Sequence, residues 1–207
     1  INELSIFHYI NKPDCRTNII FAIDKSQAVG DWGVDNQVIS NTFNINIDTK
    51  EKHKFGTVFR SSPDIVQLAF NILSSGVTLF TNFENPLDYS SFNFTKEDER
   101  KCERPLYKLC SDDEKTIEEA FIWADTYCKE KNCLKSNVLI ITTTDFLLKQ
   151  AESYAKSSHK AFEVLKSRSD SKTIRMAFEG NKYILGGIDY VGGLEFEDVV
   201  IIGVDEG

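Results

Sequence analysis

The stretch "NVLIITTTDFLLKQAESYAKSS" (residues 137–158) decides the fold, because its hydrophobic pattern changes period once. Residues 137–144 form a short apolar run rich in β-branched side chains, which is typical of a buried strand. Residues 145–158 follow with the spacing of an amphipathic helix. A buried strand that leads into a helix is the unit from which parallel α/β sheets are built.

The segments on either side continue this alternation of strands and helices. Residues 111–131 predict a strong helix that begins with three acids and carries Lys129 and Lys131 near its end, as the helix dipole favours. Its expected buried stripe is Ile117, Ala120, Phe121, Ala124 and Cys128. Later, "KTIRMAFEG" (172–180), "KYILGGI" (182–188) and residues 199–204 each predict a strand. The pattern therefore predicts an α/β domain with a mostly parallel sheet.

An earlier stretch, "FRSSPDIVQLAFNIL" (59–73), predicts a helix start after a short strand, "KFGTVFR" (54–60). Ser62 is a cap residue and Pro63 suits the first turn. Apolar residues then recur at helical spacing, which predicts a packed helix face. Arg60 lies at the carboxyl end of the strand, where it is either a phosphate clamp or a solvated charge.

Composition restricts the classes of function. The 207 residues are 41% hydrophobic, which predicts a packed core, and the net charge of −8 argues against binding nucleic acid by bulk charge. No apolar run is long enough to cross a bilayer. Five scattered cysteines without a CxxC pair predict reduced thiols in a cytoplasmic protein, and no metal site is expected.

Three polar segments each follow a predicted strand: "DKSQAVGDW" (24–32), "FRSS" (59–62) and "YVGGLEF" (190–196). In a parallel sheet such segments share one edge and can converge on one ligand. Their residue types suit a nucleotide. Gln27 can contact a terminal phosphate, and Arg60 offers a fork of donors to phosphate oxygens. Gly193 permits close backbone approach, and Glu195 can accept a ribose hydroxyl.

Four blocks, in order, resemble the UvrD/Rep-like superfamily 1 DNA helicases. "IDKSQAVGDW" (23–32) resembles motif III and "VFRSSPDI" (58–65) resembles motif IV. Residues 118–145 match an acidic helix followed by a strand, with threonines where the family often has an arginine. "IDYVGGLEFEDV" (188–199) resembles motif V. Together the blocks cover most of the chain.

The resemblance implies a RecA-like, P-loop NTPase-type fold, with a mostly parallel sheet and helices on both faces. Residues 1–50 would be the tail of a first RecA-like domain, and residues 51–207 most of the second. It also implies an ATP-dependent DNA helicase that moves on single-stranded DNA, with ATP and Mg²⁺ as cofactors. The rest of the RecA-like core would be supplied by the same chain outside this sequence.

The resemblance also implies roles at matching positions. Gln27 would sense the γ-phosphate, Arg60 would contact it, and Glu195, beside Gly193, would bind the ribose. Trp32 would stack on a base of single-stranded DNA. No GxxxxGK[ST] loop occurs, so the Mg²⁺ ligands would lie outside this sequence, and the 207 residues alone are expected not to hydrolyse ATP.

Two departures in motif V leave alternatives open. Asp189 replaces the usual histidine and Gly192 the usual lysine, which removes groups that could touch DNA or phosphate. A second hypothesis is therefore a helicase-derived interaction or regulatory module without unwinding activity. It would belong to a DNA repair or phage-defence complex and would bind a partner such as a nuclease. A third is a plain nucleotide-binding α/β domain.

Overall fold

The computed structural model describes residues 37, 40–41, 57–58, 61–75, 93–94, 104–168 and 170–204. These residues belong to two compact units. The first includes the described residues up to 108, and the described residues of the second are 109–168 and 170–204. The predicted domain boundary near residue 50 lies outside the described residues.

The first unit contains three described elements. Strand β1 (Thr57–Val58) pairs in parallel with β2 (Asn93–Phe94), and α3 (Pro63–Ser75) follows β1 in the chain. The Ser62 hydroxyl accepts a hydrogen bond from the Ile65 N–H at 3.4 Å, which confirms the predicted cap. The expected packed face of α3 is not confirmed, because Ile65 is 46% exposed, and Leu68 and Ile72 are also exposed.

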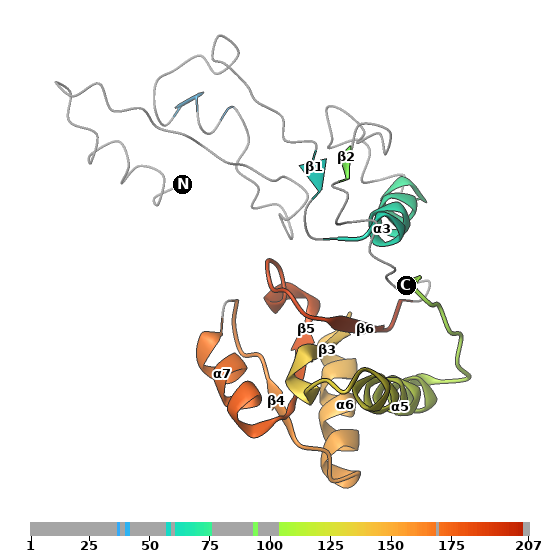
Figure 1. The fold of residues 1–207 in the computed structure, drawn as a ribbon, viewed down its shortest axis with the longest axis vertical. Coiled ribbons are helices and arrows are strands. Elements are labelled where there is room, and N and C mark those ends of the chain that lie inside the picture. Colours follow the sequence, from blue (N-terminus) through green and yellow to red (C-terminus); the bar gives the residue numbers. More distant parts are fainter. Residues whose placement is uncertain are drawn as a thin grey trace, which may run out of the picture. The chain divides into compact units, whose positions relative to one another are not determined.

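The second unit is an α/β domain whose described strands form a four-stranded, all-parallel sheet in the order β4-β5-β3-β6 (Figure 1). This confirms the predicted α/β class and the parallel sheet. In chain order its elements are α5 (Asp113–Lys131), η5 (Lys135–Asn137), β3 (Val138–Thr142), α6 (Asp145–Ser157), β4 (Phe162–Val164), α7 (Ser171–Gly180), β5 (Tyr183–Gly187), η6 (Ile188–Tyr190) and β6 (Asp198–Ile202).

Strand β3 lies between β5 and β6, and all five of its residues are buried. Its side chains alternate between two hydrophobic clusters, with Val138 and Ile140 in one and Leu139 and Ile141 in the other. The clusters occupy opposite faces of the sheet, because successive strand residues point to opposite sides. Burial on both faces explains why this segment is a continuous apolar run.

Helices α5 and α6 pack on the face of Val138 and Ile140, and α7 packs on the other face. Phe121 of α5 is fully buried against Tyr154 of α6, with ring centroids 5.4 Å apart. Burial of a side chain of this size stabilises a fold by about 1.5–3 kcal/mol. Of the predicted buried stripe of α5, Cys128 alone is half-buried rather than buried.

The segment 172–180 is a helix, so its prediction as a strand was wrong. Asp170 caps α7 by accepting the Thr173 N–H at 3.1 Å, and Asn181 ends the helix with a left-handed φ of 46°. Thr173 and Ala177, four residues apart, are the buried positions of α7. The short strand β4 was not predicted.

Strand β6 forms one edge of the sheet. Val199 and Ile201 pair in register with Leu139 and Ile141, so they share the face that α7 covers elsewhere. Val199 is 44% exposed and Ile201 is 52% exposed. At β6 the face on which α7 packs is therefore apolar, and no described helix covers it there. Among the described helices, none combines the length and apolar character needed to cross a membrane.

Candidate functional site

The carboxyl ends of β3 and β5 form a switch point in the sheet. These strands are neighbours, and Thr142 pairs in register with Gly187 at their ends. After β3 the chain enters α6, which packs on one face of the sheet. After β5 it continues into residues 188–196, where Val191 and Leu194 pack on the opposite face. A crevice between connections that leave to opposite faces is where open α/β sheets bind ligands.

Two of the predicted site residues lie in the segment that follows β5. The Leu194 N–H donates to the Val191 carbonyl at 3.0 Å and closes a turn. Gly193 in this turn has a φ of 85°, which an L side chain rarely adopts. A Cβ at Gly193 would meet no atom within 4 Å, so its backbone is open to a ligand. Glu195 follows the turn and is exposed.

The other predicted site residues, Gln27, Trp32 and Arg60, lie outside the described residues. Their convergence with Glu195 on one nucleotide stays a prediction.

The three threonines at the end of β3 and directly after it, residues 142–144, are mainly structural. Thr144 caps α6 by accepting the Leu147 N–H at 3.2 Å, and the Thr143 hydroxyl donates to the Gly203 carbonyl at 2.9 Å. Thr142 is fully buried, and its hydroxyl has no hydrogen-bond partner within the described structure. These side chains offer hydroxyls where the helicase family often has a cation.

A cationic side chain from the segment after β4 lies at this edge. Arg168 follows β4, and its Nε donates a hydrogen bond to the Asp189 carbonyl in η6 at 3.0 Å. The bond holds an exposed guanidinium beside the segment that carries Gly193 and Glu195. Sequence reasoning missed Arg168 because it missed β4. The short run "AFEVL" (161–165) before it was the available signal.

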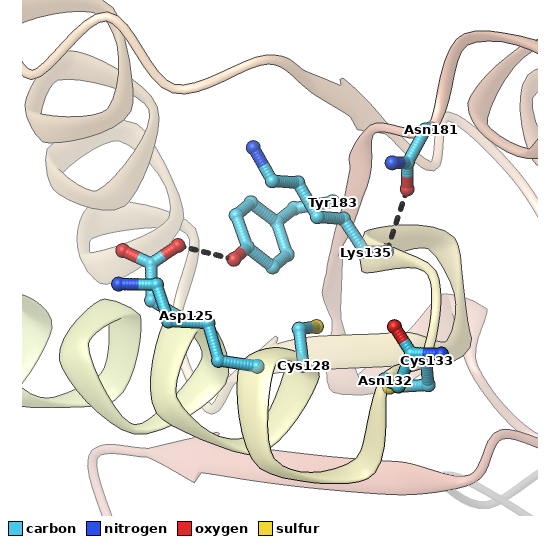
Figure 2. A pocket seen from close by; sticks show the side chains of 8 residues that line it. Asp125, Cys128, Asn132, Cys133, Lys135, Asn181 and Tyr183 are labelled. Carbon is cyan, nitrogen blue, oxygen red and sulfur yellow. Dashed lines mark hydrogen bonds between the residues drawn. The ribbon is translucent and has the colours of Figure 1, made fainter.

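A polar pocket lies at the opposite, amino edge of the sheet. It has a volume of about 510 Å³ and lies between the end of α5, η5 and the first residue of β5 (Figure 2). Its lining includes Asp125, Cys128, Cys133, Lys135 and Tyr183. This pocket therefore lies at the other edge of the sheet from Gly193 and Glu195.

Asp125 and Tyr183 are the paired groups of this pocket, as Figure 2 shows. The Tyr183 hydroxyl donates to Asp125 Oδ1 at 2.5 Å, and Lys160 forms an ion pair with Oδ2. Burial raises the pKa of Asp125, but hydrogen bonds from Lys160 and Tyr183 and the Lys160 charge hold it below its usual value. Burial and the bond to Asp125 raise the pKa of Tyr183. The resting pair is a carboxylate and a protonated phenol.

The same pocket holds two thiols, Cys128 and Cys133. Burial and contact with Cys133 raise the pKa of Cys128 to about 11. The Lys135 ammonium lies 5.5 Å from the centre of the Tyr183 ring, a cation–π contact. Sequence reasoning missed this pocket. One signal was present: Asp125 lies four residues after Phe121 and three before Cys128, which puts a carboxylate on an apolar stripe.

Comparisons with protein-family models, with curated proteins and with solved structures each found no match.

Proposed function

We propose that this chain is part of an ATP-dependent DNA helicase or translocase with a RecA-like fold. One observation carries the proposal. The residues that resemble helicase motif V follow β5 at the switch point of a parallel sheet, with Gly193 in a left-handed turn and Glu195 exposed. A nucleotide between two RecA-like domains would lie against this edge.

In this proposal different residues contact different parts of ATP, which binds together with Mg²⁺. Glu195 accepts a ribose hydroxyl, and the Gly193 backbone approaches the nucleotide closely. Arg168 is suited to phosphate oxygens, because a guanidinium presents several donors in a plane. Gln27 and Arg60 contact the γ-phosphate. An arginine that stabilises the transition state of phosphoryl transfer is worth about 3 to 5 orders of magnitude in rate.

The acidic composition fits a particular mode of DNA contact. With a net charge of −8, broad attraction to phosphates is weak. Stacking of bases on an aromatic side chain needs no net positive charge and contributes about 1–3 kcal/mol per base. Trp32 is the residue that we propose for this contact.

The test is ATP hydrolysis by the full-length protein with and without single-stranded DNA. Glu195→Ala should raise the KM for ATP about 10- to 150-fold, which corresponds to a lost hydrogen bond of about 1.5–3 kcal/mol to a charged group. Glu197→Ala is the matched control, because Glu197 is also exposed but lies beside β6, where it accepts the Asn137 side-chain amide at 2.7 Å. Equal KM values for the two variants, or no stimulation by DNA, would contradict the proposal.

A second candidate function is a helicase-derived interaction module that does not unwind DNA. Asp189 and Gly192 favour it, since they stand where the helicase family has a histidine and a lysine. The exposed apolar face at Val199 and Ile201 also suits a protein partner, such as a nuclease or repair protein.

Gly192→Lys separates the two candidates. A Cβ at this position meets no atom within 4 Å, so a lysine fits without displacing the fold. In a DNA motor this substitution should strengthen binding to single-stranded DNA and steepen its salt dependence by about one counterion. If the chain is an interaction module, neither the natural protein nor this variant should bind DNA. Ile122→Lys, at an exposed position of α5 away from this edge, controls for the added charge.

A further inference from the structure

The C-terminal end of α5 brings two cysteines together. Asn132 ends the helix with a left-handed φ of 52°, and the N–H of Cys133 donates to the carbonyl of Cys128 at 3.1 Å. This is the six-residue ring of a Schellman motif, in which the side chains of the first and last residues commonly pack together. In this helix both of those side chains are thiols. We propose that Cys128 and Cys133 form a reversible disulfide, which makes the amino-edge pocket a thiol-oxidation site.

The backbone geometry permits the bond. With standard bond lengths, a hydrogen bond of 3.1 Å holds the two Cα atoms no more than about 7 Å apart. Disulfides join Cα atoms that are about 4.4–6.8 Å apart. The hydrogen bond therefore holds the two Cα atoms within or close to this range, so the disulfide needs rotation of the two side chains rather than a change in the turn.

Both thiols are accessible to a small oxidant. Each is half-buried, and each lines the pocket shown in Figure 2. Cys110, the other described cysteine, is also half-buried but lies before α5 and outside this lining. Proximity therefore distinguishes the pair from Cys110, whereas exposure does not.

The order of the chemical steps follows from the environment of Cys128. Since burial and contact with Cys133 together raise the pKa of its thiol to about 11, Cys128 supplies little thiolate at neutral pH. Cys133 therefore attacks first. Its thiolate displaces one thiolate from a low-molecular-weight disulfide and forms a mixed disulfide. Cys128 then loses its proton, attacks the Cys133 sulfur and releases the second thiol. Two protein thiols are oxidised, and one small disulfide is reduced to two thiols.

The test uses the full chain in glutathione and glutathione disulfide. After quenching, free thiols are alkylated and peptides are analysed by mass spectrometry. We expect Cys128 and Cys133 to lose alkylation together in one peptide, and dithiothreitol to restore both. Cys110→Ser should leave this result unchanged. This proposal does not depend on the helicase proposal, because the measurement needs neither nucleotide nor DNA.

Two variants test the order of attack. Cys128→Ala keeps a small apolar side chain and should accumulate a mixed disulfide of glutathione with Cys133. Cys133→Ser should leave Cys128 fully alkylated. The proposal is overturned if both thiols stay alkylated in excess glutathione disulfide, because the two cysteines then only complete the apolar contact of the Schellman motif. A bond from either of them to another cysteine also overturns it.

Discussion

Replacing Tyr183 with phenylalanine should cost about 1.5 kcal/mol of unfolding free energy. The substitution removes the hydroxyl that donates to Asp125 at 2.5 Å and keeps a ring that is fully buried. Hydrogen bonds to charged groups contribute about 1.5–3 kcal/mol. We expect the lower end, because the Asp125 side chain is 27% exposed and keeps its ion pair with Lys160.

Urea unfolding at neutral pH measures this loss as a lower midpoint at unchanged slope. Tyr154→Phe is the matched control. Its ring packs in the same core, 5.4 Å from that of Phe121, and its hydroxyl donates to nothing in the described structure. The control should keep the midpoint of the natural protein.

The pH dependence of this loss of stability tests whether it comes from the hydrogen bond to the ionised Asp125. The folded pKa of Asp125 lies below its unfolded value of about 3.8, so the stabilisation from its ionised form is complete above that pH. It is lost as pH falls through the folded pKa, because the carboxyl is then protonated in both states. The difference in unfolding free energy between the natural protein and Tyr183→Phe should therefore become smaller in acid. A constant difference, or a loss no larger than that of Tyr154→Phe, would refute the reasoning.

Three further predictions use the same urea assay. Gly203→Ala should cost more than about 1 kcal/mol, because its φ is 85° and a Cβ would collide with Leu147; Gly187→Ala, with no atom within 4 Å of the new Cβ, should cost less. Thr144→Ala should cost about 0.5–2 kcal/mol through the lost cap of α6. Ile201→Lys should change stability by less than about 0.5 kcal/mol, since its side chain is 52% exposed, and a large loss would mean that this face is covered.

The sequence predicted the elements whose hydrophobic period is unambiguous. Residues 137–158 gave β3 and α6 because a buried strand and an amphipathic helix differ in period, and α5 carries clear charges at both ends. Residues 172–180 were wrongly predicted as a strand for two reasons. Thr173 and Ile174 suit a strand, and the carboxylate of Asp170 was not recognised as the cap that starts a helix.

The candidate site was predicted only in part, because its geometry depends on contacts between distant segments. Gly193 and Glu195 could be found from a motif that is continuous in the chain. Arg168 meets Asp189 through a bond across 21 residues, and Tyr183 meets Asp125 across 58. No local pattern in the sequence encodes such pairs, because their partners meet only in the folded domain.

The pairing of β3 with β6 affects how the domain folds during its synthesis. The two strands are joined in register over five residue pairs, yet Val138 and its partner Asp198 are separated by the whole of α6, β4, α7 and β5. Closing so long a loop costs entropy before the contacts between β3 and β6 form and offset that cost. During synthesis, β3 has one side without a neighbour until β6 leaves the ribosome. Over that interval the most apolar of the described strands is exposed to wrong pairing, which is the condition that leads incomplete chains to aggregate.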